Sequence, residues 1–261
     1  MSDKPSMSQV HFPPGAEVPR ALYQRVYVWQ LPIRIFHWTN AAAVTVLFAT
    51  GLMISNPTLT SGGEAWQVMT VATIRKIHYI AAFVFAIGFL WRIYWFYMGN
   101  VYARSGLPRP WKASWWRDLF SQSKDYLTLH FGTPHLGHNS LAGLSYTMFV
   151  IGLGWIQIFT GFAMYSENTP DSLLAHATGW VLPLLGGSAQ VHAWHHLFAW
   201  LFLFFVILHL YIVFLDARQY RNGLVVSMVT GFKFRRLRAH ERKALDEREK
   251  ERETSEREDQ G

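Results

Sequence analysis

The sequence predicts an all-α integral membrane protein, a four-helix bundle with both termini in the cytoplasm and further interfacial helices at the membrane surface. Three observations support this fold class: four long apolar stretches, a low content of charged residues and an uneven distribution of Lys and Arg. Hydrophobic residues make up 51% of the 261 residues and charged residues only 16%. A typical soluble domain contains about 25% charged residues.

Four stretches are long and apolar enough to cross a bilayer, which takes ~20 residues. They cover residues 35–54, 77–98, 141–165 and 194–215, and none of them contains proline. Only an α-helix satisfies every backbone group of such a segment in lipid. We therefore predict a membrane domain over residues 27–232. It is flanked by a polar N-terminal segment (1–26) without a cleavable signal peptide and by a charged tail (233–261), solvated or disordered.

Lys and Arg predict the orientation of the spans. They are frequent before the first span, between the second and third, and after the fourth, whereas the two remaining connections contain only Arg75 and Lys76. Because positive residues stay in the cytoplasm, both termini and the connection 99–140 are expected there. The net charge of +7 is thus a topology signal, and no binding to nucleic acid is expected. Aromatic residues in 108–132 predict an interfacial helix, and 166–193 predicts a short outer one.

The chain contains 12 histidines and no cysteine. Without cysteine there is no disulfide, no cysteine-ligated iron–sulfur cluster, no covalently attached haem and no thiol nucleophile. We predict no catalytic residues in this chain. If this protein carries electrons or metals, histidines must provide the ligands.

Four histidines lie within the predicted spans, at two depths. His195 and His209 are 14 residues apart, so they share one helix face and lie about 21 Å apart along the axis. The first span starts in the cytoplasm, which brings His37 to the depth of His209. The second span starts outside, which brings His78 to the depth of His195. The sequence therefore predicts two histidine pairs, one above the other.

Two histidines per site, without cysteine, favour a low-spin b haem at each level, because such an iron needs two axial ligands. A catalytic zinc site needs three or four protein ligands close together, which this spacing does not provide. The neighbouring His196 is an alternative ligand to His195, although it points about 100° away from His209 around the helix. Hydrogen-bonded packing residues or a proton path are the other interpretations of histidines inside a membrane.

Two further patterns accompany the histidines. Arg34 and Arg75 each precede a ligand candidate by three residues, so each could pair with a haem propionate; the alternative is that they are interfacial anchors. Thr50-Gly51 in the first span and Thr160-Gly161 in the third lie at matching depth. These small residues could make room for a flat macrocycle, or they could serve close helix packing alone.

Several segments of the chain resemble a known family. They are VYVWQLPIRIFHWTNA, IRKIHYIAAFVFAIGFLWRIYW, GHNSLA, FTGFAMY and VHAWHHLFAW, followed by His209. In this order and spacing, from Tyr27 to Phe232, they resemble the cytochrome b subunit of membrane-bound nickel–iron hydrogenases, which is related to the gamma subunit of formate dehydrogenase. The charged tail lies outside the resemblance.

The resemblance implies a multi-pass protein of the bacterial inner membrane with two haem b groups. It implies that His37 with His209, and His78 with His195, match the axial-ligand positions. Electrons would pass from the hydrogenase small subunit, which connects to the large subunit, to quinone in the membrane lipid. An oligomer of the whole complex is compatible with this arrangement.

The GHN motif, with His138 and Asn139, matches the region that the resemblance associates with quinone. A quinone needs a hydrogen-bond donor at its carbonyl and a route for protons, and these two residues lie at the water-facing start of the third span. The alternative for Asn139 is a helix N-cap.

Three other functions remain compatible with the sequence. The partner could be formate dehydrogenase or another periplasmic oxidoreductase, because the cytochrome chemistry would be identical. The chain could be a histidine-lined metal or proton transporter, which would require polar residues along a continuous path. It could also merely anchor a peripheral enzyme.

Overall fold

The computed structural model describes residues 23–56, 69–129, 135–220 and 223–237 and, in the tail, residues 240–244, 247 and 251. Most of the predicted N-terminal segment and tail lies outside these residues. Tyr27–Lys233 forms one compact unit, and the described residues outside it belong to a second, smaller one.

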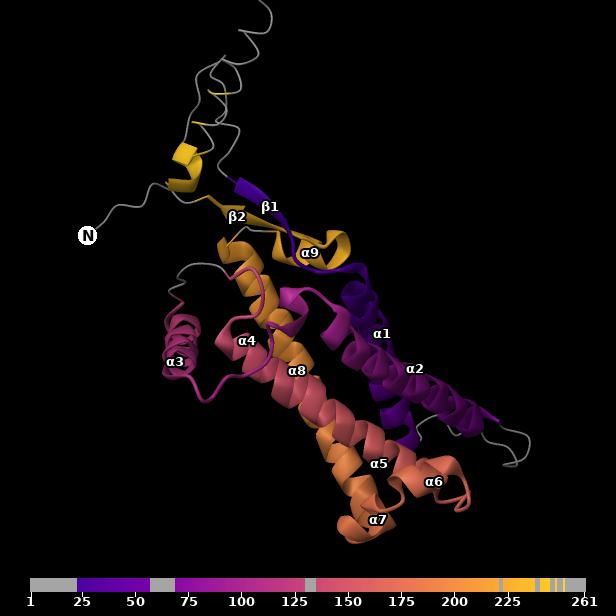
Figure 1. The fold of residues 1–261 in the computed structure, drawn as a ribbon. Coiled ribbons are helices and arrows are strands. Elements are labelled where there is room, and N and C mark those ends of the chain that lie inside the picture. The colour runs from indigo at the N-terminus through magenta and orange to yellow at the C-terminus, as the bar shows by residue number, and fades with distance from the viewer. Residues whose placement is uncertain are drawn as a thin grey trace, which may run out of the picture. The chain divides into compact units, whose positions relative to one another are not determined.

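Four long apolar helices dominate the larger unit, as predicted (Figure 1). They are α1 (Leu31–Ser55), α2 (Thr70–Met98), a third span (Ser140–Ser166) that ends in α5 (Gly154–Ser166), and α8 (Ser188–Tyr220). α1 packs along α2, and α5 packs along α8. We call the end of the bundle at which α1 begins the proximal end and the opposite end the distal end.

The helices expose much of their apolar surface, as expected for segments that face lipid. Ile87 and Leu90 on α2, and Leu210 and Phe214 on α8, are all at least 59% exposed. In water such a surface would drive aggregation, whereas in a bilayer it is the favourable arrangement.

Between the helices lies a core rich in phenylalanine. Phe36 of α1, Phe85 and Phe89 of α2, Phe162 of α5 and Phe202 of α8 are all buried in it. Phe85 and Phe202 are in edge contact, with ring centroids 6.3 Å apart. Phe202 lies seven residues from both His195 and His209, so this aromatic core fills the space between the two histidine levels.

The third span starts as α4 (Ser140–Ser145), continues as the π-helical segment η3 (Tyr146–Leu153) and ends as α5. A π-helical turn widens the helix, is often found at functional sites and changes the direction of the side chains that follow. The apolar pattern of the sequence predicted the span but not this irregularity.

Shorter helices lie at both ends of the bundle. At the proximal end are the 3₁₀ turn η2 (Val101–Arg104), α3 (Ala113–Thr128) and α9 (Leu224–Thr230). α3 exposes Trp116, Phe120 and Leu127, an apolar face that suits the membrane surface. At the distal end, α6 (Leu173–Thr178) and α7 (Val181–Leu184) occupy the connection for which a short apolar helix was predicted.

Two short strands, β1 (Tyr23–Tyr27) and β2 (Phe232–Arg236), pair into a sheet that the sequence analysis did not predict. Next to it, the carbonyl of Gly231 accepts the amides of Val28 and Trp29 at 2.9 and 3.0 Å. Gly231 has φ +87°, and a Cβ there would approach the Tyr27 ring to 2.5 Å. Only glycine fits this position. The hydrogen bonds to its carbonyl connect the start of the membrane domain to its end.

Candidate haem sites

The proximal pair, His37 of α1 and His209 of α8, brings two imidazole rings close together across the bundle. Their ring centroids are 6.5 Å apart and the rings are inclined by 53°. With a metal–imidazole bond of about 2 Å, two rings on opposite sides of one iron have centroids about 6 Å apart. The observed separation therefore fits one haem iron between the two rings.

Aromatic rings surround this pair and restrict its orientation. Trp38 meets His37 edge-on at 5.0 Å between centroids, and Phe205 stacks on His209 at 5.8 Å. Nδ1 of His37 is buried and makes no hydrogen bond among the described residues. The proximal pair is thus positioned by packing rather than by a hydrogen-bonding side chain.

The distal pair is His78 of α2 and His195 of α8, whose imidazoles lie within range of an electrostatic interaction. Each ring is positioned by a threonine of a neighbouring helix. Thr50 Oγ1 is 2.9 Å from Nδ1 of His78, and Thr160 Oγ1 is 2.8 Å from Nδ1 of His195. Both Thr-Gly dipeptides noted in the sequence therefore contact a predicted ligand.

The hydrogen bonds of the two threonines determine the tautomer of each distal ring. Thr50 donates its hydroxyl proton to the carbonyl of Val46 at 2.6 Å, and Thr160 donates to the carbonyl of Ile156 at 2.7 Å. Each hydroxyl oxygen can then only accept, so Nδ1 of each histidine carries the proton. The lone pair remains on Nε2, the nitrogen that a haem iron requires.

The glycines of the two dipeptides make room for the same rings. A Cβ at Gly51 would lie 3.5 Å from Cε1 of His78, and one at Gly161 would lie 3.2 Å from Cε1 of His195. Thr50-Gly51 and Thr160-Gly161 are therefore equivalent supports, one on α1 and one on α5. Space for the histidine ring, rather than helix packing alone, explains these glycines.

His196 is in a different environment from its neighbour. It is exposed, and its Nε2 accepts a hydrogen bond from Nε1 of Trp200 at 3.0 Å. The bond occupies the nitrogen lone pair that a metal would need. Of the two candidates in the sequence, the geometry favours His195.

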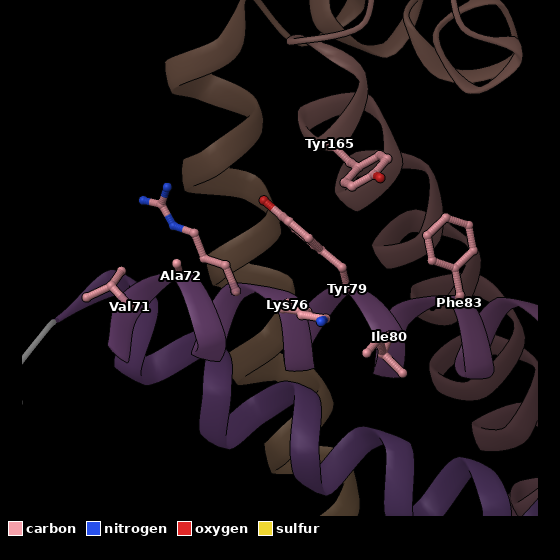
Figure 2. Close-up of a pocket in the computed structure, with 8 residues that line it drawn as sticks. Val71, Ala72, Lys76, Tyr79, Ile80, Phe83 and Tyr165 are labelled. Carbon is pink, nitrogen blue, oxygen red and sulfur yellow. The ribbon is translucent and has the colours of Figure 1, made fainter. Parts of the chain in front are cut away.

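The two arginines that precede ligand candidates have different surroundings. The guanidinium of Arg34 donates to the carbonyl of Val229 in α9. Arg75 lines a cavity of about 570 Å³ at the distal end, together with Tyr79 and Tyr165. Figure 2 shows Tyr79 projecting from α2 on the side of Tyr165. Pairing of either arginine with a propionate stays a prediction.

The GHN turn lies at the proximal end and is held by α3. The side chain of Asn139 accepts the amide of Ala142 at 2.7 Å and donates to Gln122 of α3 at 3.1 Å. Asn139 therefore acts as the N-cap of α4, and both ends of its amide are in use. Asp118 of α3 accepts the backbone amide of Ser140 at 3.1 Å, which positions the turn further.

His138 is half-buried at the proximal end. Its Nδ1 is 3.1 Å from Ser105 Oγ, which itself donates to the carbonyl of Tyr102 at 2.7 Å, so Nδ1 carries the proton and Nε2 keeps its lone pair. Burial, together with the charges of Lys233, Arg92 and His209, lowers the pKa of His138 to about 4. At neutral pH this imidazole is uncharged, and its Nε2 can only accept.

Two buried cations next to His138 were missed by the sequence analysis. Arg92 is 8% exposed and Lys233 is 3% exposed. Ionisable residues inside a span are functional candidates by default, and Arg92 lies within the predicted span 77–98, so that rule could have identified it. Lys233 follows the last span, where many charges occur, and nothing in the sequence distinguished it.

Fold and site together define a class of protein: an α-helical membrane protein whose spans present histidines in facing pairs. Among the described residues, no three His, Cys, Asp or Glu side chains form a group that could hold a metal ion. Haem, held by two ligands, suits this arrangement better than a metal ion held by three.

Comparison with known proteins identifies the family. Residues 28–231 match the family described as prokaryotic cytochrome b561, and the chain belongs to this family. The b-type cytochromes carry haem b, so the family and the paired histidines agree on the type of cofactor.

The similar proteins share a common description. A probable Ni/Fe-hydrogenase B-type cytochrome subunit of Azotobacter vinelandii is 39% identical over 213 residues, which are 80% of this chain and 88% of the relative. The counterpart in Cupriavidus necator is 37% identical over 222 residues, 84% of this chain and 91% of the relative. A probable Ni/Fe-hydrogenase 1 B-type cytochrome subunit of Escherichia coli K12 is 33% identical over 212 residues, with coverages of 79% and 90%.

Proposed function

We propose that the chain is a di-haem b-type cytochrome subunit that passes electrons from a periplasmic Ni/Fe hydrogenase across the bacterial inner membrane to quinone. The observation that carries this proposal is the facing pair His37–His209, with ring centroids 6.5 Å apart. Each haem, when bound, would take up and release one electron at a time. His37 and His209 would hold the proximal haem, and His78 and His195 the distal one.

The residues around the pairs support this assignment. Thr50 and Thr160 keep Nε2 of the distal histidines deprotonated and so prepare both for an iron. The phenylalanine core between the two levels excludes water, which suits electron transfer between fixed sites in a medium of low polarity. The names of the similar proteins support a Ni/Fe hydrogenase as the partner.

Lys and Arg assign the proximal end to the cytoplasm, so the distal end would face the hydrogenase in the periplasm. The quinone would then bind at the proximal end near His138. Because Nε2 of His138 is an acceptor, this residue would accept the hydroxyl proton of a quinol in a hydrogen bond. That role differs from the donor role expected for this side chain from the sequence.

Haem content and optical spectra of the purified complex test the proposal. A pyridine haemochrome assay should give two haem b per chain. Replacing His209 with Leu should remove one of them and abolish hydrogen-dependent quinone reduction, while hydrogenase activity with a soluble dye persists. A protein that purifies with fewer than two haems, or a His209→Leu variant that keeps quinone reduction, would contradict the proposal.

A further inference from the structure

Arg92 faces the interior of the bundle from the proximal part of α2. It shares one helix face with Ala81, Phe85 and Phe89, the other buried residues of α2. Its Nη2 donates to the carbonyl of Ala103 at 2.6 Å, whereas its buried Nη1 makes no hydrogen bond among the described residues. The guanidinium lies 5.6 Å from the centroid of the Tyr146 ring and is close to the hydroxyl of that tyrosine.

Lys233 brings a second buried charge to the same place. Its Nζ donates to the carbonyl of Leu136 at 2.8 Å and lies 5.4 Å from the centroid of the Trp29 ring. An ammonium group has three donors, and this carbonyl uses one of them. Nε1 of Trp29 is also buried without a hydrogen bond among the described residues.

A row of aromatic rings connects the two cations. The Trp29 ring meets the His138 ring edge-on at 5.2 Å between centroids, and His138 lies 5.6 Å from Tyr146. The order is therefore Lys233, Trp29, His138, Tyr146 and Arg92. His138 lies within electrostatic range of His209, which places this row beside the proximal pair.

The row has donors and positive charge but too few acceptors. Among the described residues, no carboxylate forms an ion pair with Arg92 or Lys233. Asp216 acts on Lys233 electrostatically, but its Oδ2 accepts a hydrogen bond from Tyr126 at 2.9 Å. A buried cation without an anion costs several kcal/mol, so an anionic group with several oxygen atoms is the complementary ligand.

We propose that Arg92 and Lys233 form a buried cationic site for carboxylates, namely the propionates of the haem held by His37 and His209. This inference rests on the proposed function because it requires a haem at that pair. A haem has two propionates, which equal the two cations in number and carry the opposite charge. A neutral quinone headgroup could accept hydrogen bonds from the same donors, but it would leave both charges without a counter-ion.

The site has a consequence for the reduction potential. Positive charge beside a haem stabilises the added electron and raises the potential. The two cations should therefore make the proximal haem the more easily reduced of the two. Electrons would then move favourably from the distal to the proximal haem.

An optical redox titration of the purified complex tests this site. Arg92→Gln and Lys233→Gln should each lower the midpoint potential of one haem, the one whose signal His209→Leu removes, and leave the other haem unchanged. Arg92→Lys retains the charge and should stay close to wild type. Arg104→Gln is the matched control, since Arg104 lies at the same end but is exposed, and among the described residues its side chain hydrogen-bonds the carbonyl of Gly99 alone.

The outcomes separate this inference from the proposed function. Unchanged potentials in haem-loaded Arg92→Gln and Lys233→Gln would overturn the propionate site while leaving two haems in place. If these two variants raise the KM for quinone and leave both potentials unchanged, the site binds quinone, and the propionate site is overturned as well. If Arg92→Gln does not fold, the potentials of Lys233→Gln and Arg92→Lys test the propionate site on their own. Wild-type protein with one haem would instead refute the proposed function.

Discussion

The hydroxyl of Thr160 lies 2.8 Å from Nδ1 of His195 and donates its own proton to the carbonyl of Ile156. One hydrogen bond from a side chain to the backbone of its own helix thus determines which nitrogen of a histidine on another helix carries a lone pair. Thr50 repeats the arrangement for His78. His37 has no such support, because its Nδ1 is buried without a hydrogen bond among the described residues.

Replacing Thr160 with Val should weaken binding of the distal haem. The valine removes the acceptor of the Nδ1 proton, and a buried donor without a partner costs about 1–3 kcal/mol. Loss of such outer contacts typically lowers metal affinity by about 10–100-fold. Haem dissociation, followed at the Soret band, should become faster by a similar factor, and the potential of this haem should rise because its ligand becomes less basic.

Two variants control this experiment. Thr160→Ser keeps the hydroxyl and should behave like wild type. Thr45→Val removes a hydroxyl that bonds the carbonyl of Ala41 and that has no hydrogen bond to a histidine within the described part of the chain, so haem binding should be unaffected. Equal effects of Thr45→Val and Thr160→Val would show that helix stability, rather than the ligand, is affected.

Alanine at the two dipeptide glycines should have unequal effects. A Cβ at Gly161 would meet Cε1 of His195 at 3.2 Å, closer than an ordinary contact, whereas one at Gly51 would meet His78 at 3.5 Å. Gly161→Ala must displace the ring by a few tenths of an ångström. Electron paramagnetic resonance of the ferric distal haem should therefore change more in Gly161→Ala than in Gly51→Ala. The reverse order would contradict this geometry.

Neighbouring histidines should differ sharply in a substitution experiment. His195→Gln should cost one haem per chain in the pyridine haemochrome assay. His196→Gln should keep both, because Nε2 of His196 already accepts the indole proton of Trp200. Loss of haem in the His196 variant with retention in the His195 variant would reverse the assignment.

His138 should make the folded protein less stable in acid. Its pKa in the folded protein is about 4, below the ordinary 6.5, so between these values the unfolded chain binds a proton that the folded protein does not. Above pH 6.5 this difference in proton binding does not affect the free energy of unfolding. As the pH falls from 6.5 to 4, the free energy of unfolding decreases by about 3 kcal/mol in total. Thermal denaturation midpoints measured from pH 7.5 to 4.5 should fall less steeply in His138→Gln than in wild type.

His135→Gln serves as the control for that series, because His135 is 39% exposed beside Asp118. The variant controls for the loss of a histidine outside the buried cluster: its denaturation midpoint at pH 7.5 should stay close to that of wild type, because an exposed side chain contributes little to stability. If the pH profile of His138→Gln coincides with wild type, the imidazole is not the group that titrates.

Much of the candidate site could be predicted because membrane helices follow simple rules. A helix has a fixed rise and rotation per residue, so positions alone place His195 and His209 on one face and at two depths. Successive spans start alternately on the cytoplasmic and the outer side of the membrane, and this alternation pairs His37 with His209. The structure brings these two rings together. Asn139 shows the limit of such reasoning: position suggested a quinone ligand or a cap, and the contacts show a cap.

The sequence by itself determined that this chain crosses a membrane four times and presents histidines at two depths, because hydropathy and helix geometry are local properties of a segment. Tertiary structure alone decided which nitrogen each distal histidine offers, how the surroundings of His195 and His196 differ, and that Arg92 and Lys233 lie near His138. These features depend on side chains from different helices and on hydrogen bonds that join residues far apart in the chain. No regularity along the sequence records such contacts.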